Sequence, residues 1–404
     1  MRICKKVKKI GLENVYQSAA VIVETVLRED MPTDSLCVIN PKNLARAANY
    51  TRQKQRPEDP TDIDFELQLG NIVPGFVLQD IAKDTARHII FATPEQRELL
   101  RSVKQVFMDG TFRVVRKPFT QLFSFHGFLM DEDDLVVKQV PLAFVLMSRR
   151  RKRDYVAVFK AIRDIAPHLD NVDIDLVTDF EPATWEAAAK VFPKATMHGC
   201  SFHWAQAVMR AVQLKGLIVA YKTDLHVNRF IKKLFALPYL PVDEIEGAFD
   251  RLASSGTEEF KEEVKPIVDY IRNTWMNGCQ QYSKPTSWCV YNRAIRTNND
   301  VEGWHNKLNK AAGGRASLPF YSLVALLYGE ADWIRIELRL LTADQLRRYQ
   351  RKETKTTQRK LFKLWQDYEN QTISISQLVR KLSHLDSVIP RTADEAPEEQ
   401  SEGQ

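Results

Sequence analysis

Three carboxylates from distant parts of the chain have surroundings typical of metal-ligating residues. Asp109 follows the apolar run VFM and Asp179 follows DLVT, so each closes a segment expected to be a buried strand, whereas Glu302 opens a helical segment. Carboxylate oxygens are the ligands that Mg²⁺ and Mn²⁺ prefer. Two such ions, about 3.5–4 Å apart, can promote in-line phosphoryl displacement. The three residues therefore predict a two-metal site that cuts or joins nucleic acid.

The two aspartates also have structural interpretations. Asp109 precedes Gly110, and Asp-Gly is common in tight turns, although the apolar residues that follow do not indicate an immediate reversal. Asp179 could complement the dipole of a helix that begins at Pro182, and Glu181 competes with it for either role. The metal-site interpretation of Asp179 thus depends on the presence of Asp109.

The third carboxylate has the strongest alternative. Asn299 and Glu302 have the spacing of a capping box, and Asp300 is a rival ligand. A carboxylate at a helix N-terminus can still face a metal, so both roles are compatible. Asp173 and Asp175 precede the second aspartate, but Asp175 is about 13 Å away from it at the usual strand rise. Those two residues are expected to mark the solvated start of that strand.

A C-x-x-H unit, Cys200 and His203, supplies half of a possible zinc site if a helix begins there. Zinc is disfavoured, because none of the remaining candidates forms a matching C-x-x-C or H-x-x-x-H pair. These candidates are His198, His305, Cys279 and Cys289. The expected role of the unit is packing or hydrogen bonding beside the acidic site.

The elements that must position these residues follow from residue 101 onward. Period-two and short apolar runs predict strands over 102–115, 118–130, 138–148, 172–180 and 195–203, with helices over 154–166, over 182–192 and from Trp204. The order β-β-β-α-β-α-β-α predicts an α/β, ribonuclease H-like fold with a mixed five-stranded sheet and flanking helices. A right-handed crossover would make the first and fourth strands parallel neighbours. Asp109 and Asp179 would then lie side by side.

Length and composition define the remaining organisation. The chain has 404 residues, 44% hydrophobic and 27% charged, which suggests a globular protein of two or three domains. No apolar run is long enough to span a bilayer, and the five cysteines form no evident disulfide framework. Residues 1–98 form a mixed, largely helical region that indicates no function. The core domain is expected over 99–330, with a helical insertion at about 215–291.

The net charge of +6 is unevenly distributed. Residues 347–363 contain eight lysines and arginines and one glutamate, interleaved with aromatic residues, which predicts an amphipathic helix in a helical C-terminal extension over 331–388. A solvated helix is the alternative. Residues 389–404 are acidic and expected to be disordered. The predicted DNA-binding residues are Arg347, Arg348, Arg351, Lys352, Lys355, Arg359 and Lys360.

A second basic run, RRRKR at residues 149–153, lies in a turn between a predicted strand and a predicted helix. It is compatible with a nuclear localisation signal or with a loop that contacts phosphate. Solvated surface charge is the default interpretation for such a turn.

Four segments, MDGTF, TDFEPATW, GCSFHWAQAV and RTNNDVEGWHNKLN, closely resemble the catalytic domain of Mutator-like element (MULE) transposases over about residues 100–330. The resemblance implies that Asp109, Asp179 and Glu302 are the acidic triad and that Cys200 and His203 are the C-x-x-H pair of that family. It also implies cleavage and strand transfer of DNA with Mg²⁺ or Mn²⁺. The expected partners are transposon ends and target DNA, in a homo-oligomer, with nuclear localisation and no membrane association.

The sequence departs from the family at its N-terminal side. Family members commonly carry a zinc-binding module there, but Cys4 and Cys37 have no nearby histidine to complete one. Recognition of specific element ends is therefore in doubt. The alternatives to an active transposase are a transposase-derived DNA-binding or transcriptional regulator without catalysis and an inactive, truncated element copy.

Overall fold

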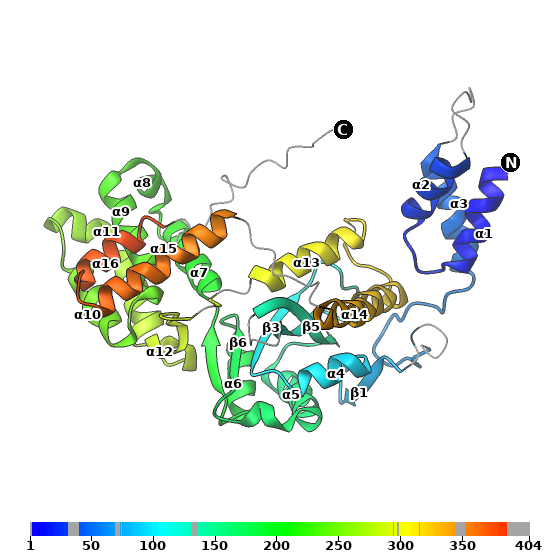
Figure 1. The fold of residues 1–404 in the computed structure, drawn as a ribbon, viewed down its shortest axis with the longest axis horizontal. Coiled ribbons are helices and arrows are strands. Elements are labelled where there is room, and N and C mark those ends of the chain that lie inside the picture. Colours follow the sequence, from blue (N-terminus) through cyan, green and yellow to red (C-terminus); the bar gives the residue numbers. More distant parts are fainter. Residues whose placement is uncertain are drawn as a thin grey trace.

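The computed structural model describes residues 2–30, 40–68, 73, 75–130, 136–293, 295–296, 299–314, 316–343 and 352–385, without the side chains of 136–137 and 352–355. A sheet lies at the centre of the molecule, with a lobe of helices on one side and three N-terminal helices on the other (Figure 1). None of the described helices combines the length and the apolar composition that a membrane span needs.

Among the described residues, seven strands form one mixed sheet in the order β1-β2-β5-β4-β3-β6-β7. They are β1 (Val77–Lys83), β2 (Ala86–Phe91), β3 (Gln105–Thr111), β4 (Gln121–Met130), β5 (Val136–Met147), β6 (Asp175–Thr178) and β7 (Thr196–Gly199). The predicted mixed α/β class is confirmed, but the prediction of five strands is wrong. The hairpin β1–β2 extends the sheet because the fully buried β2 pairs with β5.

The helices within and beside the sheet are α4 (Pro94–Leu100), α5 (Lys152–Ile165), α6 (Pro182–Val191), α13 (Asn299–Ala311) and α14 (Phe320–Thr342). Helix α5 connects β5 to β6, which pairs in parallel with β3, as the sequence predicted. The register places Phe107 opposite Val177. Each of these residues precedes a predicted metal ligand by two positions.

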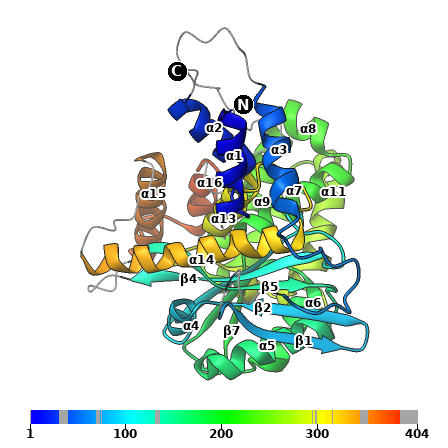
Figure 2. The same ribbon diagram turned by 90° about the vertical axis from the view of Figure 1, so that its right-hand side faces the viewer.

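Helices cover both faces of the sheet (Figure 2). On one face, α5 and α6 pack on a core that includes Phe123, Phe125 and Phe159. On the other, α13 and α14 lie across the strands, and the Trp304 ring stacks on Phe144 with 5.5 Å between centroids. Strand residues are therefore apolar on both faces, and a polar side chain within a central strand needs a specific explanation.

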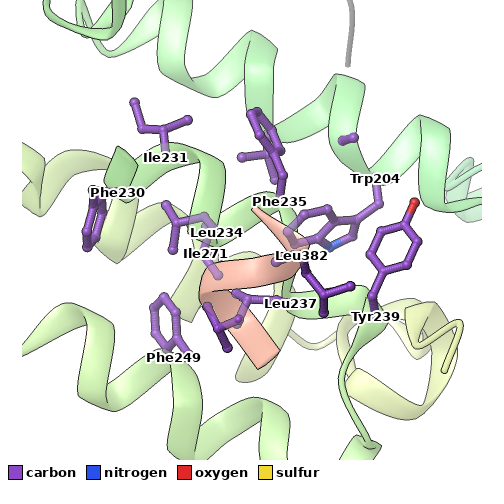
Figure 3. Packing of buried hydrophobic residues seen from close by; sticks show 14 of the residues in the cluster. Trp204, Phe230, Ile231, Leu234, Phe235, Leu237, Tyr239, Phe249, Ile271 and Leu382 are labelled. Atoms are coloured by element: carbon purple, nitrogen blue, oxygen red, sulfur yellow. The ribbon is translucent and has the colours of Figure 1, made fainter. Parts of the chain in front are cut away.

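A separate helical lobe follows the sheet. Its helices are α7 (Ser201–Leu214), α8 (Ile218–Thr223), α9 (Leu225–Phe235), α10 (Val242–Ala253), α11 (Glu258–Ile271), α12 (Pro285–Trp288), α15 (Lys352–Glu369) and α16 (Ile375–Leu382). Leu382 of α16 lies in the middle of the lobe's core, between Phe235 and Phe249 (Figure 3). The C-terminal segment thus completes the core of the predicted insertion. The expected boundary at residue 330 lies inside α14.

The N-terminal helices α1 (Arg2–Glu13), α2 (Ala19–Asp30) and α3 (Pro41–Gln53) form a small bundle. Its core comprises eight buried residues, among them Val7, Ile22, Val26, Leu44 and Ala48. Helices α1 and α3 pack closely at Gly11, where a Cβ would lie in ordinary contact with the Cβ of Ala48, at 3.5 Å. This core is distinct from the two cores that flank the sheet.

Candidate active site

Parallel strands β3 and β6 place two of the predicted ligands. Asp109 and Asp179 each lie two positions beyond the paired residues Phe107 and Val177, so by strand alternation the four residues share one face of the sheet. Phe107 and Val177 pack against Val301 of α13. The residue after Val301 is Glu302, and α13 therefore carries the third carboxylate to the same face.

Burial and mutual repulsion dominate the electrostatics of this acidic site. Asp109 is only 7% exposed. Burial, together with the charges of Asp179 and Glu302, raises its pKa to about 8, against a hydrogen bond that the Gly110 N–H donates to Oδ1 at 2.8 Å. Burial also raises the pKa of Glu302, to about 7, and that of Asp179. The charge of Arg150 acts on Asp179 in the opposite direction.

Two histidines contact the carboxylates. The Nε2 atom of His203 lies 3.6 Å from Oε1 of Glu302, and the Nδ1 atom of His305 lies 3.7 Å from Oδ2 of Asp109. Burial lowers the pKa of each imidazole to about 4, so both are neutral near pH 7. They therefore do not neutralise the acidic site. The sequence analysis considered His305 only as a possible zinc ligand, although its i, i+3 spacing from Glu302 predicts a shared helix face.

The C-x-x-H unit lies at the start of α7. Cys200 is fully buried, and its N–H donates to the carbonyl of Thr178 at the end of β6. The N–H and hydroxyl of Ser201 both donate to the carbonyl of Arg296, at 3.2 and 2.7 Å. These contacts tie α7 to β6 and to the segment before α13, and they place His203 beside Glu302.

The three carboxylates lie near one another but do not form a complete metal-coordination site. In the part of the chain that the structure describes, no three His, Cys, Asp or Glu side chains converge closely enough to hold an ion. Asp179 is held loosely, since the Thr178 hydroxyl and the Glu181 N–H donate to its Oδ1 at 3.4 Å each. These two hydrogen bonds are long, and neither fixes the Asp179 carboxylate strongly.

The rival residues have other environments. Glu181 precedes α6 and accepts hydrogen bonds at Oε2 from the Tyr155 hydroxyl, at 2.7 Å, and from Thr184. Asp300 is exposed and is not among the charges that act on Asp109. Helix α13 begins at Asn299, so Asn299 is its first residue and not its N-cap, and Glu302 is its fourth residue instead of the N3 residue of a capping box.

Asp175 differs from the expectation that it marks a solvated strand start. Its carboxylate is half-buried and accepts hydrogen bonds from His198, at 2.9 Å, and from Arg293, at 3.4 Å. Burial opposes ionisation, but these two partners more than offset it and lower the pKa of Asp175. This ion pair therefore joins β6 and β7 to the segment that leads to α13.

The basic segment predicted to bind DNA is only partly described. Arg347, Arg348 and Arg351 lie outside the described residues, as do the side chains of Lys352 and Lys355. Arg359 and Lys360 are exposed on α15. Leu361 and Trp365 of the same helix are buried in the lobe, which gives α15 the amphipathic character that the sequence predicted.

Comparison with known proteins shows which part of the chain resembles a known family. Residues 105–207 match the family model of the MULE transposase domain. No curated protein matches the chain. The matched segment runs from β3 to α7 and includes Asp109, Asp179, Cys200 and His203, whereas Glu302 lies beyond it. The match indicates a transposase-related function. The segment from β3 to α7 is therefore similar to the MULE transposase domain, and the resemblance of this chain to the MULE transposase family is confirmed.

Proposed function

We propose that this chain is a MULE-type DNA transposase that cleaves DNA and transfers the cut strand at a metal-dependent site formed by Asp109, Asp179 and Glu302. The observation that carries the proposal is the burial of Asp109 beside the other two carboxylates. Buried like charges without a cationic partner destabilise a fold, and such clusters gather at functional sites. A protein that only bound DNA would gain stability by losing them.

The donor set fits Mg²⁺ or Mn²⁺. Asp109, Asp179 and Glu302 would hold the ions through carboxylate oxygens, which these cations prefer and zinc does not require. When bound, the ions would supply the charge stabilisation that in-line phosphoryl displacement needs. The Gly110 N–H orients the Asp109 carboxylate, and His305 and His203 lie as neutral groups beside Asp109 and Glu302, respectively. Rotation of the loosely held Asp179 would complete the ligand set.

The sheet supports a ribonuclease H-like assignment of the fold. Strands β5-β4-β3-β6-β7 are adjacent in that order, with β3 and β6 parallel across the α5 crossover. In this assignment the hairpin β1–β2 and the helical lobe are additions to the nuclease core. The proposed substrates are transposon ends and target DNA, handled by a homo-oligomer in the nucleus, in agreement with the family resemblance and a net charge of +6.

Nicking of a supercoiled plasmid tests the proposal. Wild-type protein should nick in Mg²⁺ or Mn²⁺ and not in EDTA, while Asp109→Asn, Asp179→Asn and Glu302→Gln should each lose nicking and keep DNA affinity. Asp300→Asn is the matched control, because it removes a neighbouring carboxylate that is exposed. DNA binding with no nicking by the wild type would instead support the transposase-derived regulator, and metal-independent nicking would contradict the acidic site.

A further inference from the structure

A basic pocket lies between the β1–β2 hairpin and α5, on the sheet face opposite α13. It encloses about 680 Å³. Two of its lining residues, His88 and Asp154, are buried, at 2% and 4% exposure, and form the base of the pocket. Its cationic lining residues are Lys83, Arg151, Lys152, Arg153, Lys160 and Lys190. Three elements therefore contribute positive charge to one hollow.

Most of this charge is uncompensated. Arg151 pairs with Asp154 at 2.9 Å, and Lys152 pairs with Glu186 at 2.8 Å. The remaining four cations, Lys83, Arg153, Lys160 and Lys190, make no ion pair with any described residue, and Asp84 is the one further carboxylate in the lining. Burial lowers the pKa of His88, which is therefore neutral near pH 7. The pocket thus presents four unpaired cations against one carboxylate.

The part of the pocket beside the β1–β2 turn lies at the same end of the strands as the acidic site. Paired residues form a row across this end, from Thr111 through Leu122 and Leu146 to Ile89, which is the neighbour of His88. Three strand spacings of about 4.8 Å separate β3 from β2, and four separate β3 from β1. The pocket therefore begins roughly 15–20 Å from the strand that carries the first catalytic candidate.

The loop between β5 and α5 lies between the acidic site and the pocket, at the ends of the strands. Arg150 acts electrostatically on Asp179, and its guanidinium lies over the exposed ring of Phe112, at 4.7 Å from the centroid. The next residue, Arg151, already lines the pocket. Arg150 and Arg151 thus place positive charge beside the acidic site and in the pocket, within the RRRKR run whose role the proposed function leaves open.

We infer that this pocket binds the phosphate backbone of the DNA that is processed at the acidic site. The pocket and the acidic site lie on opposite faces of the sheet, so the duplex would pass around the ends of the strands. At about 3.4 Å of helix axis per nucleotide, the contacted phosphates would lie at least about four base pairs from the reacting one. Such contacts fix the register of a duplex without reading its sequence. The continuity with the acidic site favours a nucleic-acid chain over a small polyphosphate. The inference rests on the proposed function, since it assumes that the DNA is cut at the acidic site.

The test measures duplex affinity as a function of salt. All proteins carry Asp109→Asn and are kept in EDTA, so that cleavage does not disturb the equilibrium. The pocket variant combines Lys83→Gln, Arg153→Gln, Lys160→Gln and Lys190→Gln. A charge-retaining version carries Arg at the three lysines and Lys at Arg153. The control removes four cations from the lobe, through Lys215→Gln, Arg229→Gln, Lys232→Gln and Lys284→Gln.

Each lost phosphate contact lowers the slope of log affinity against log salt by about 0.9, so the pocket variant should lose roughly 3–4 in slope. Its affinity loss between about 50 and about 200 mM salt should accordingly be about 150-fold smaller than that of the parent protein. The lobe control and the charge-retaining version should keep the parental slope. Unchanged melting temperatures would show that all the variants are folded.

Three results would overturn the inference, and they are distinguishable. A parent protein without duplex affinity would reject the pocket and the proposed function together. Parental affinity with an unchanged slope in the pocket variant would reject the pocket alone, and plasmid nicking by the wild type would still stand. The third result involves tripolyphosphate, added as a probe that raises the melting temperature of the parent protein if it binds. If the pocket variant bound duplex normally but no longer showed this rise, the pocket would hold a small polyphosphate instead of DNA.

Discussion

The Nε2 atom of His203, in the first turn of α7, lies 3.6 Å from Oε1 of Glu302, in the first turn of α13. In the sequence, α7 comes before most of the helical lobe and α13 comes after most of it. Contact between the two side chains therefore links the position of the third carboxylate to the packing of the lobe. Because the imidazole is neutral near pH 7, it can orient Glu302 through a hydrogen bond after a small rotation without cancelling its charge.

The first prediction is that His203 positions Glu302. His203→Ala should lower plasmid nicking about 10–100-fold and raise the Mg²⁺ concentration needed for half-maximal rate, as is usual for residues that orient metal ligands. His203→Gln, which retains a neutral donor, should restore part of the rate. His226→Ala, at an exposed histidine of α9, is the control. A lower melting temperature with unchanged Mg²⁺ dependence would assign His203 a structural role only.

The second prediction concerns Asp109 and pH in metal-free protein. Its folded pKa of about 8 lies above the unfolded value, so the native state binds a proton more tightly and loses stability as pH rises from about 4 to about 8. Asp109→Asn removes this loss. The variant should match the wild type near pH 4 and exceed its unfolding free energy by a few kcal/mol near pH 8, measured by urea denaturation in EDTA.

Asp175→Asn is the matched control with the opposite sign. Its folded pKa is lowered by His198 and Arg293, so its contribution to stability is present at neutral pH and lost as the pH falls through that value. Asp175→Asn should therefore be less stable than the wild type at pH 7 and equal to it in acid. Parallel pH profiles for the two variants would contradict the environments described for both aspartates.

The third prediction follows from the close approach of Gly199 to the residue after Asp179. A Cβ at Gly199 would lie 2.1 Å from Cε1 of Phe180, far inside contact distance. The Phe180 ring is itself packed against Trp275, with 4.7 Å between centroids. Gly199→Ala should therefore displace Phe180, cost about 1–3 kcal/mol of stability and reduce nicking, because the neighbouring Asp179 moves with the backbone.

Gly303→Ala is the matched control, because it makes the same substitution at a position where the added methyl group meets no side chain. Outside the adjacent residues and the backbone of α13 itself, no atom lies within 4 Å of a Cβ placed at Gly303. Alanine has the higher helix propensity, so this variant should gain about 0.5–1 kcal/mol, measured by thermal unfolding. Equal destabilisation by both substitutions would exclude the contact with Phe180 as the cause.

The neighbourhood of Asp109 and Asp179 could be predicted because it depends on local signals. Each aspartate ends a short apolar run, and a helix of suitable length between the runs requires a crossover and a parallel pair. The same argument failed for β1 and β2. Strand β1 is half-exposed and irregular in pattern, and its turn uses Asp84 at φ 52° instead of an Asn-Gly or Asp-Gly pair. The apolar run IIF of β2 is a local strand signal, but β1 offers no clear pattern that would pair with it in a hairpin.

Contacts between distant segments could not be predicted. Helix α15 was recognised as amphipathic, but its apolar face carries no information about which surface receives it. The packing of that face in the lobe, more than 100 residues earlier in the chain, emerges only from the three-dimensional structure. The contacts of His203 and His305 with the carboxylates likewise depend on how the lobe positions α7 and how the sheet positions α13.

The fourth prediction is that Trp365 anchors α15 in the lobe. Its side chain is 1% exposed, and its Nε1–H donates to the carbonyl of Tyr239 at 2.8 Å. Trp365→Ala should cost about 3–5 kcal/mol and make the segment from residue 352 onward sensitive to limited proteolysis. Phe362→Ala, in the same helix at 37% exposure, should cost less than about 1 kcal/mol. If both variants resisted protease as the wild type does, α15 would not depend on this contact.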